Sequence, residues 1–153
     1  MAGAEDIEIR TANRGDLAAI VQLLQRDSLA DPPEEPGLTA ALIEAFDAIA
    51  AHPDNEIVVA TPGGQVAGTL QLTFILGLSF QGAWRAQVEG VRVREDLRNR
   101  RIGTHLMEWV IGRARDRGCR LVQLTSNKKR IDARRFYKRL GFRASHEGMK
   151  LHL

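Results

Sequence analysis

The chain has 153 residues and a mass of 17.0 kDa, which is enough for one domain with a single buried core. Its apolar residues (44%) and charged residues (27%) are in ordinary globular proportions and exclude a disordered tail or a collagen-like fibre. The single cysteine excludes a disulfide scaffold, and the Cys and His residues are not clustered as zinc ligands are. We therefore expect one metal-free domain over residues 1–153.

The beginning of the chain predicts its location. It reads MAGAEDIEIR and lacks the apolar core of a secretory signal. No apolar run reaches the roughly 20 residues needed to cross a bilayer. We expect a cytoplasmic protein that does not interact with a membrane.

The charges are unevenly distributed, although the net charge is only +3. Residues 31–56 contain seven Asp or Glu and no Lys or Arg, whereas residues 92–143 contain 17 Lys or Arg against five Asp or Glu. This segregation indicates an anionic partner for the basic half and a cationic one near the acidic segment. The alternative is two solvated surfaces. A basic surface also suits nucleic acid, but its strands have no interleaved aromatic residues, so we expect no nucleic-acid partner.

The first half of the chain predicts two helices after a short strand. Residues 7–10 alternate between apolar and polar, as a strand does. Asn13 and Asp16 then resemble a capping box, which begins a helix with apolar residues at helical spacing. A proline-rich loop over residues 31–37 leads to a second helix over residues 39–51.

The middle of the chain predicts three strands. Residues 56–61 and 66–75 are rich in strand-forming types and flank a Pro-Gly-Gly turn, which predicts a hairpin. A loop over residues 77–82 leads to a further strand over residues 84–93. Gly90 lies inside this strand and marks a possible site for a bulge.

The last third alternates helix and strand. We expect a helix over residues 102–117, a strand over 120–125, a short helix over 132–140, and one or two strands over 142–153. The order predicts a mixed α/β fold of the α+β kind. Its sheet is mostly antiparallel and contains one parallel βαβ unit.

The segment between the third of these strands and the next helix carries the clearest chemical signal. It reads Arg98-Asn-Arg-Arg-Ile-Gly-Thr104, so a helix begins here beside a glycine. The first turn of a helix has N–H groups without intrahelical acceptors and the positive end of the dipole, which suit a phosphate. Gly103 would let the backbone approach a ligand. The segment predicts an anion cradle; the alternative is an ordinary strand-to-helix loop. No P-loop, dinucleotide-binding or hydrolase motif is present.

At this point the sequence resembles the GNAT N-acetyltransferase superfamily. Arg98-x-x-Arg101-x-Gly103 is similar to that family's Q/R-x-x-G-x-G/A loop, and Arg135-Phe-Tyr-Lys-Arg-Leu-Gly-Phe142 is similar to its FYxxLGF segment. The order of elements agrees over nearly the whole chain. One departure is Arg101, which stands where the family has glycine. If this position requires a positive φ, the arginine costs about 1 kcal/mol or more.

The resemblance implies acetyl-CoA as the donor and direct transfer of the acetyl group to a primary amine. The main chain near Val91 and Val93 would pair with the pantetheine arm, and Asn127 would lie on its other side, where two parallel strands splay apart. The residues implied in acetyl-CoA binding are Val91, Arg92, Val93, Arg98, Asn99, Arg100, Arg101, Ile102, Gly103, Thr104, His105 and Asn127.

The acceptor site is expected to form from residues 31–51 and 77–84, the regions that vary in the family. The acidic surplus of the first region predicts a cationic small molecule or a peptide amine. The resemblance also implies a homodimer. A competing interpretation is a catalytically weak acyl-CoA-binding regulatory module, because Arg101 departs from the motif.

Glu89 is the candidate base. Transfer to an amine needs the neutral amine, which a nearby carboxylate helps to produce. Without a bulge, Glu89 would point to the same face of the strand as Val91 and Val93. Some members of the family carry a glutamate on this strand as the base, which supports the assignment. The alternative is an ordinary solvent-facing carboxylate or a structural partner of Arg85.

Tyr137 is the candidate acid. It is the only tyrosine in the chain, and the resemblance implies that its hydroxyl protonates or stabilises the leaving thiolate. Its position next to Phe136 places it at the rim of the buried face of the helix over residues 132–140. The alternative is a tyrosine that only packs.

Overall fold

The computed structural model describes residues 6–26, 28–30, 33 and 36–153. The chain divides into two compact units, Met1–Gln123 and Leu124–Leu153. The first unit contains the sheet, apart from the last residue of its final strand, together with its flanking helices. The second contains α5 (Ile131–Arg139) and the C-terminal segment.

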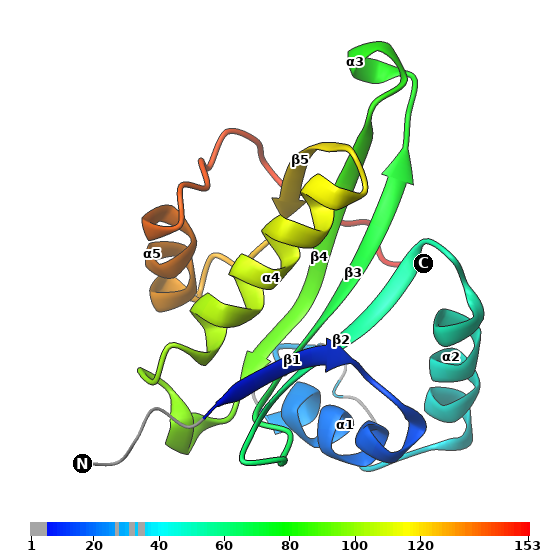
Figure 1. Cartoon of the computed structure of the whole chain (residues 1–153), viewed down its shortest axis with the longest axis vertical. Helices are drawn as coiled ribbons and strands as arrows, with labels where there is room; N and C mark the ends of the chain where they lie inside the picture. Colours follow the sequence, from blue (N-terminus) through cyan, green and yellow to red (C-terminus); the bar gives the residue numbers. More distant parts are fainter. Residues whose placement is uncertain (1–5, 27, 31–32, 34–35) are drawn as a thin grey trace. The chain divides into compact units, whose positions relative to one another are not determined.

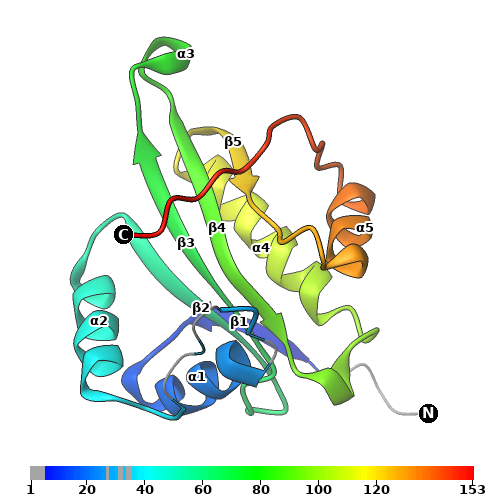
Figure 2. The ribbon, with the colours of Figure 1, turned by 180° about the vertical axis from the view of Figure 1, so that it is seen from behind.

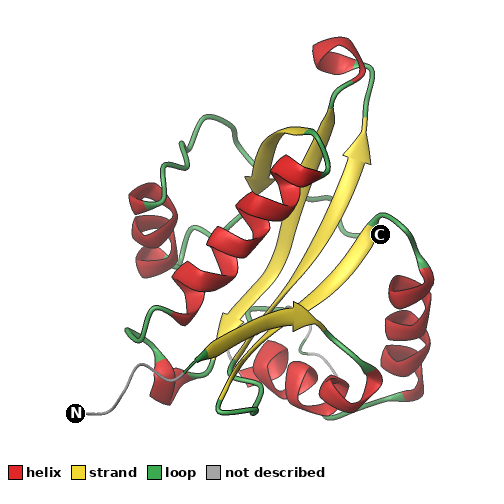
Figure 3. Ribbon diagram, viewed as in Figure 1, coloured by secondary structure: helices red, strands yellow, loops and turns green. Residues whose placement is uncertain are grey.

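The sheet has five strands in the order β1-β2-β3-β4-β5. The first four pair antiparallel, whereas β4 and β5 are parallel and are connected through α4, as Figures 1 and 3 show. This confirms the predicted mixed sheet with one βαβ unit. The strands are β1 (Ile7–Thr11), β2 (Asn55–Pro62), β3 (Gly68–Leu76), β4 (Trp84–Val93) and β5 (Cys119–Leu124).

Helices α4 (Ile102–Asp116) and α1 (Leu17–Arg26) cover opposite faces of the sheet (Figures 1 and 2). A Cβ added at Gly68 would come within 3.0 Å of side-chain atoms of α4, whereas one added at Gly90 would lie 3.3 Å from the side chain of Leu24 in α1. One face of α4 is buried against the sheet. It consists of Ile102, Leu106, Met107, Val110 and Ala114.

The other predicted helices and strands occur within one or two residues of their expected bounds, with one exception described below. Helix α2 spans Ala40–Ala51, and the Thr39 hydroxyl caps it by accepting from the Leu42 N–H at 3.3 Å. The predicted loop over residues 77–82 contains a short turn, α3 (Ser79–Gly82), at the tip of the β3–β4 hairpin (Figure 3). No helix in the described ranges is long and apolar enough to span a membrane.

The predicted strands over residues 142–153 are wrong. This segment is described throughout and forms neither helix nor strand. Its alternating apolar residues, Met149, Leu151 and Leu153, are almost fully exposed. Alternation fixes which side chains would share a face, but a strand forms only when a neighbouring strand satisfies its backbone. The sequence pattern could not supply that neighbour, and β5 therefore ends the sheet.

Asp16 secures the start of the first helical segment, a 3-10 turn over Arg14–Asp16 that leads into α1. Its carboxylate accepts from the Asn13 N–H at 2.8 Å and from both terminal nitrogens of Arg10 at 2.7 and 2.9 Å. The Arg10 hydrogen bonds lower the pKa of Asp16 against the opposing effect of burial. This confirms the predicted capping box and ties β1 to the helix.

Asp16→Asn should destabilise the fold by about 1–3 kcal/mol at pH 7, because it removes a charge-assisted pair and weakens the cap. The pKa of Asp16 is lower in the folded state than its ordinary value of 3.8, so the ionised carboxylate stabilises the native state at pH values above 3.8. This stabilisation is lost as the pH falls from 3.8 through the lowered pKa. Urea unfolding of both proteins at pH 7 and under acid measures the effect. The difference should shrink in acid; an unchanged difference would contradict the assignment.

Candidate functional site

The start of α4 has the geometry of an anion site. The first helical hydrogen bond runs from the His105 N–H to the Arg101 carbonyl at 2.9 Å. The N–H groups of Ile102, Gly103 and Thr104 therefore have no intrahelical acceptor, and no side chain caps Arg101. Because the helix has 15 residues, its dipole adds positive potential at these N–H groups. The sequence predicted this arrangement.

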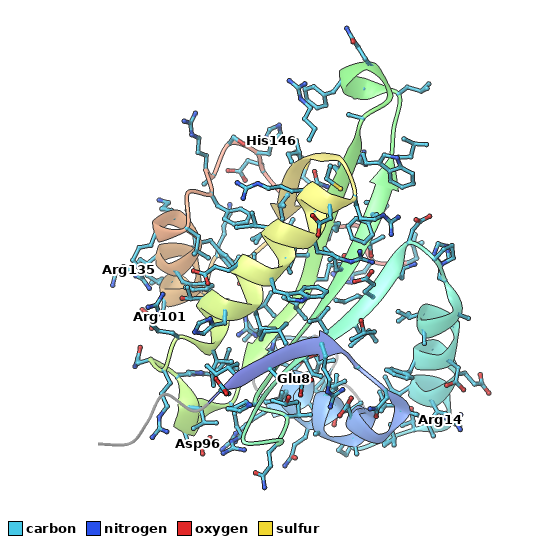
Figure 4. All side chains as sticks on the ribbon, viewed as in Figure 1. Glu8, Arg14, Asp96, Arg101, Arg135 and His146 are labelled. Carbon is cyan, nitrogen blue, oxygen red and sulfur yellow. The ribbon has the colours of Figure 1, made fainter. Side chains whose placement is uncertain are left out.

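The loop before α4 turns through left-handed backbone at two residues. Asn99 has φ 66°, and Arg101 has φ 64° and ψ 12°. Left-handed backbone suits glycine, the residue that the resembled motif has at Arg101. Arg101 therefore adopts a conformation that suits glycine while carrying a long side chain (Figure 4). Arg98, Arg100 and Arg101 are exposed and add positive charge to the loop before the helix.

Arg101→Gly should melt about 3 °C above Arg100→Gly, since relief of left-handed strain is worth about 1 kcal/mol and both glycines free the unfolded chain alike. Arg100→Gly is the matched control, because the backbone of Arg100 does not have a positive φ. Glycine at this position relieves no strain and only increases the conformational entropy of the unfolded chain. The control should melt at the same temperature as the parent or lower. Differential scanning fluorimetry compares the three proteins, and equal shifts for both variants would show that Arg101 is not strained.

A bulge at Gly90 changes the direction of the strand that carries the candidate base. Gln71 pairs with Glu89, and Thr69 pairs with Arg92, so β4 advances three residues while β3 advances two. Gly90 has φ 61°, a conformation that glycine adopts readily. The extra residue in β4 is therefore accommodated at Gly90.

Because paired residues share a face, Glu89 and Arg92 lie on the same side of the sheet. Val93 pairs with Gly68, next to Thr69 in β3, and faces the α4 side. The bulge that Gly90 marked is thus present, and Glu89 and Val93 do not share the face that a regular strand would give them. Glu89 is exposed on the side covered in part by α1.

Tyr137 lies in α5 within the second unit. Its ring is half-buried and packs between two phenylalanines, with centroid distances of 5.2 Å to Phe136 and 5.8 Å to Phe142. Edge and tilted contacts of this kind fix the orientation of a ring. Asn127 also belongs to this unit, and its Oδ1 accepts from the Lys129 N–H at 2.9 Å. These ring contacts describe packing only, and the chemical role of the phenol stays a prediction.

The acidic segment is partly neutralised by arginines from elsewhere in the chain, which the sequence could not show. Glu44 is exposed, whereas three other acids of this segment form ion pairs. Asp31, Glu34 and Glu35 lie outside the described residues. Support for a cationic acceptor is correspondingly weaker. The pairs are Asp47 with Arg14 at 2.7 Å, Asp54 with Arg117 at 2.6 Å, and Glu56 with Arg113.

Sequence reasoning did not identify several polar residues on the same face as Glu89. Gln71 and Thr73 in β3, like Gln87 and Glu89 in β4, occupy alternate positions and therefore share one face. Their period of two was a visible signal, but only the pairing of the strands places them together. Within the described ranges, no group of three His, Cys, Asp or Glu is arranged to hold a metal ion.

Comparison with known proteins places this geometry in context. Residues 17–142 match the model of the Acetyltransferase (GNAT) family. The chain is 32% identical over 106 residues to aminoalkylphosphonate N-acetyltransferase of Salmonella typhimurium (strain LT2), covering 69% of this chain and 68% of that protein. It is 28% identical over 148 residues to glucosamine 6-phosphate N-acetyltransferase of Trypanosoma brucei brucei, covering 97% of each.

A solved structure is similar over almost its whole length. It is that of a transcriptional regulator from Bacillus halodurans C-125, with 45% sequence identity and a TM-score of 0.89. The match covers 96% of this chain and 99% of that one. The fold, the loop before α4 and the family match thus agree with one another.

Proposed function

Because the chain belongs to the GNAT acetyltransferase family and is an acetyl-transferring enzyme, we propose that it moves an acetyl group from acetyl-CoA to the primary amine of a small molecule. The observation that carries this proposal is the uncapped start of α4, which follows the left-handed Arg101. GNAT acetyltransferases use acetyl-CoA. Its diphosphate matches the N–H groups and arginines found there.

The proposed binding residues come from β4, the loop before α4, the first turn of α4 and the segment that follows β5. Main-chain groups of Val91 and Val93 would hold the pantetheine arm, and N–H groups of Ile102, Gly103 and Thr104 would hold the diphosphate. Arg92, Arg98, Asn99, Arg100, Arg101, His105 and Asn127 complete the set. When bound, acetyl-CoA supplies an activated acetyl thioester.

The chemical steps are assigned to two side chains. The Glu89 carboxylate takes a proton from the ammonium form of the acceptor, directly or through water, so that the neutral amine can attack. The Tyr137 hydroxyl gives its proton to the sulfur as the thiolate leaves, and the proton that the attacking nitrogen loses on forming the amide returns to the phenolate through water. A main-chain N–H near the end of β4 stabilises the oxyanion that forms on attack. No covalent intermediate with the protein is required.

The acceptor is proposed to be a small amine rather than a peptide. Both relatives are named for small acceptors that carry an amine and a phosphorus acid group. The first expectation, a cationic molecule or a peptide amine, relied on acids of which three are now seen paired with arginines. The test below therefore includes a cationic acceptor as the alternative to be compared.

Release of free thiol from acetyl-CoA tests the proposal. The panel contains an amino sugar, an aminoalkylphosphonate, a polyamine and a lysine-containing peptide. We expect turnover of at least one small amine and little with the peptide. Absence of thiol release with every amine would contradict the proposed transfer, and preference for the peptide would contradict the small acceptor.

A second candidate is a catalytically weak acyl-CoA-binding regulatory module. The 45% identical structure of a transcriptional regulator favours it, as does the arginine at a left-handed motif position. In that case coenzyme A would raise the melting temperature while thiol release stayed near the background rate. A single domain, a homodimer and a cytoplasmic location stay predictions; sedimentation of the purified chain measures its oligomeric state.

A further inference from the structure

A row of uncharged polar side chains crosses four strands on the face of the sheet that carries Glu89. We call Asn55, Thr73, Gln87 and Gln123 the polar row. Asn55 pairs with Thr73, which pairs with Gln87. The Thr73 hydroxyl donates to Asn55 Oδ1 at 2.8 Å, and Gln123 Nε2 donates to Gln87 Oε1 at 2.7 Å. All four residues belong to the first unit.

The polar row differs sharply from the opposite face of the same strands. There, Leu72 and Val88 are almost completely buried under α4, as a protein core requires. The four residues of the polar row are only half-buried, although Thr73 and Gln87 lie within inner strands of the sheet. Polar side chains at such positions are suited to contact water or a ligand rather than a covering helix.

The polar row leads from the candidate base to a cavity. Glu89 lies two residues beyond Gln87 in β4, about 7 Å along the strand. At the other end, Asn55 lines a cavity of about 330 Å³ together with Phe46, Ala50 and His52. This volume is at the lower end of the range for small-ligand sites. If the nitrogen of a small amine lay at Glu89, the rest of the molecule could therefore contact the polar row.

The side chains of the polar row are already oriented by the two hydrogen bonds. Because each amide has both donor and acceptor groups, the bonds within the pairs leave an amide N–H₂ on Gln87 and a carbonyl on Gln123 for further partners. Such neighbouring donors and acceptors match hydroxyl groups, which both donate and accept. Fixed side chains also lose little conformational entropy on binding. Charged groups on this face of β4, Glu89 and Arg85, flank the row.

We infer that the polar row binds the hydroxyl groups of the acceptor, which is an amine with several neighbouring hydroxyls, such as an amino sugar or an amino polyol. The inference depends on the proposed function for the identity of the ligand as an acceptor. It goes beyond that function by naming a substrate class and four residues that select it.

Glucamine and hexylamine test this inference, because they have the same carbon skeleton with and without hydroxyl groups. Calorimetry measures the binding of each amine to the coenzyme A complex, and thiol release measures kcat/KM. The wild-type protein should favour glucamine by about tenfold or more in both measurements, the equivalent of one or two net hydrogen bonds.

The double variant Gln87→Met/Gln123→Met keeps the side-chain length and removes the hydrogen-bonding groups. It should reduce the preference to within about twofold, the range expected when only shape remains. Coenzyme A affinity should be unchanged. The control is Gln22→Met on the exposed face of α1, which should retain the full preference.

Two outcomes would overturn the inference: equal or tighter binding of hexylamine by the wild type, or a preference for glucamine that survives in the double variant. Both outcomes are measured by calorimetric binding and do not require turnover. Failure of the proposed function has a different signature, which is glucamine binding without any release of thiol.

Discussion

Replacing Glu89 with glutamine should lower kcat at pH 7 by about 100-fold or more, the usual loss when a general base is removed. An alkylamine with a pKa near 10.4 is neutral in only about one molecule in 2,500 at pH 7, so the lost proton acceptor limits the rate. The activity of the variant should recover as the pH is raised toward the pKa of the amine. Thiol release between pH 7 and 9.5 measures both effects.

Glu8→Gln is the matched control for this prediction. Glu8 is also an exposed glutamate on a strand, β1, and Figure 4 shows it on that strand. Its replacement should leave kcat unchanged at every pH. If Glu89→Gln behaves like this control, Glu89 is an ordinary solvent-facing carboxylate and a water chain or another group acts as the base.

Replacing Tyr137 with phenylalanine should lower kcat by about 100-fold while coenzyme A binding stays within about twofold, because only the proton donor for the leaving sulfur is lost. Phenylalanine keeps the ring contacts with Phe136 and Phe142, so the packing of α5 should persist. Thiol release and calorimetric titration with coenzyme A separate the two quantities. The loss should be in kcat, with the KM for the amine little changed.

Tyr137→Leu distinguishes chemistry from packing. It removes the hydroxyl together with the ring, so it should lower the melting temperature as well as kcat. If Tyr137→Phe retains full activity and only Tyr137→Leu impairs the enzyme, the tyrosine has a packing role. Loss of activity in the phenylalanine variant with an unchanged melting temperature would support the proton donor.

The helix α4 and its preceding loop show how much a local pattern can predict. The apolar stripe repeats every three or four residues, and a helix with this spacing buries one face wherever it packs. The N–H groups at its start lack intrahelical acceptors because of helix geometry alone. The sequence therefore predicted both the helix and its capacity to hold an anion, before any tertiary contact was known.

The direction in which the Glu89 side chain points depends on tertiary structure rather than on a local pattern. A strand alternates its side chains, but the inserted residue at Gly90 becomes a bulge only through the pairing of β4 with β3. The sequence identified Gly90 as a possible bulge site, and only the register between β3 and β4 shows that the bulge forms there. The same holds for the polar row, whose members come from four strands and meet only when the sheet forms.

By itself, the sequence predicted the main helices and the first five strands, the N–H groups without intrahelical acceptors at the start of α4, and the tyrosine and glutamate that are candidates for proton transfer. These depend on backbone geometry and on residues close together in the chain. Only the tertiary structure decided that three acids of residues 31–56 are paired with arginines, that Arg101 adopts a left-handed conformation, and that residues 142–153 do not form a strand. Ion pairs and strand pairing need partners distant in sequence, and local periodicity contains no information about which partners meet.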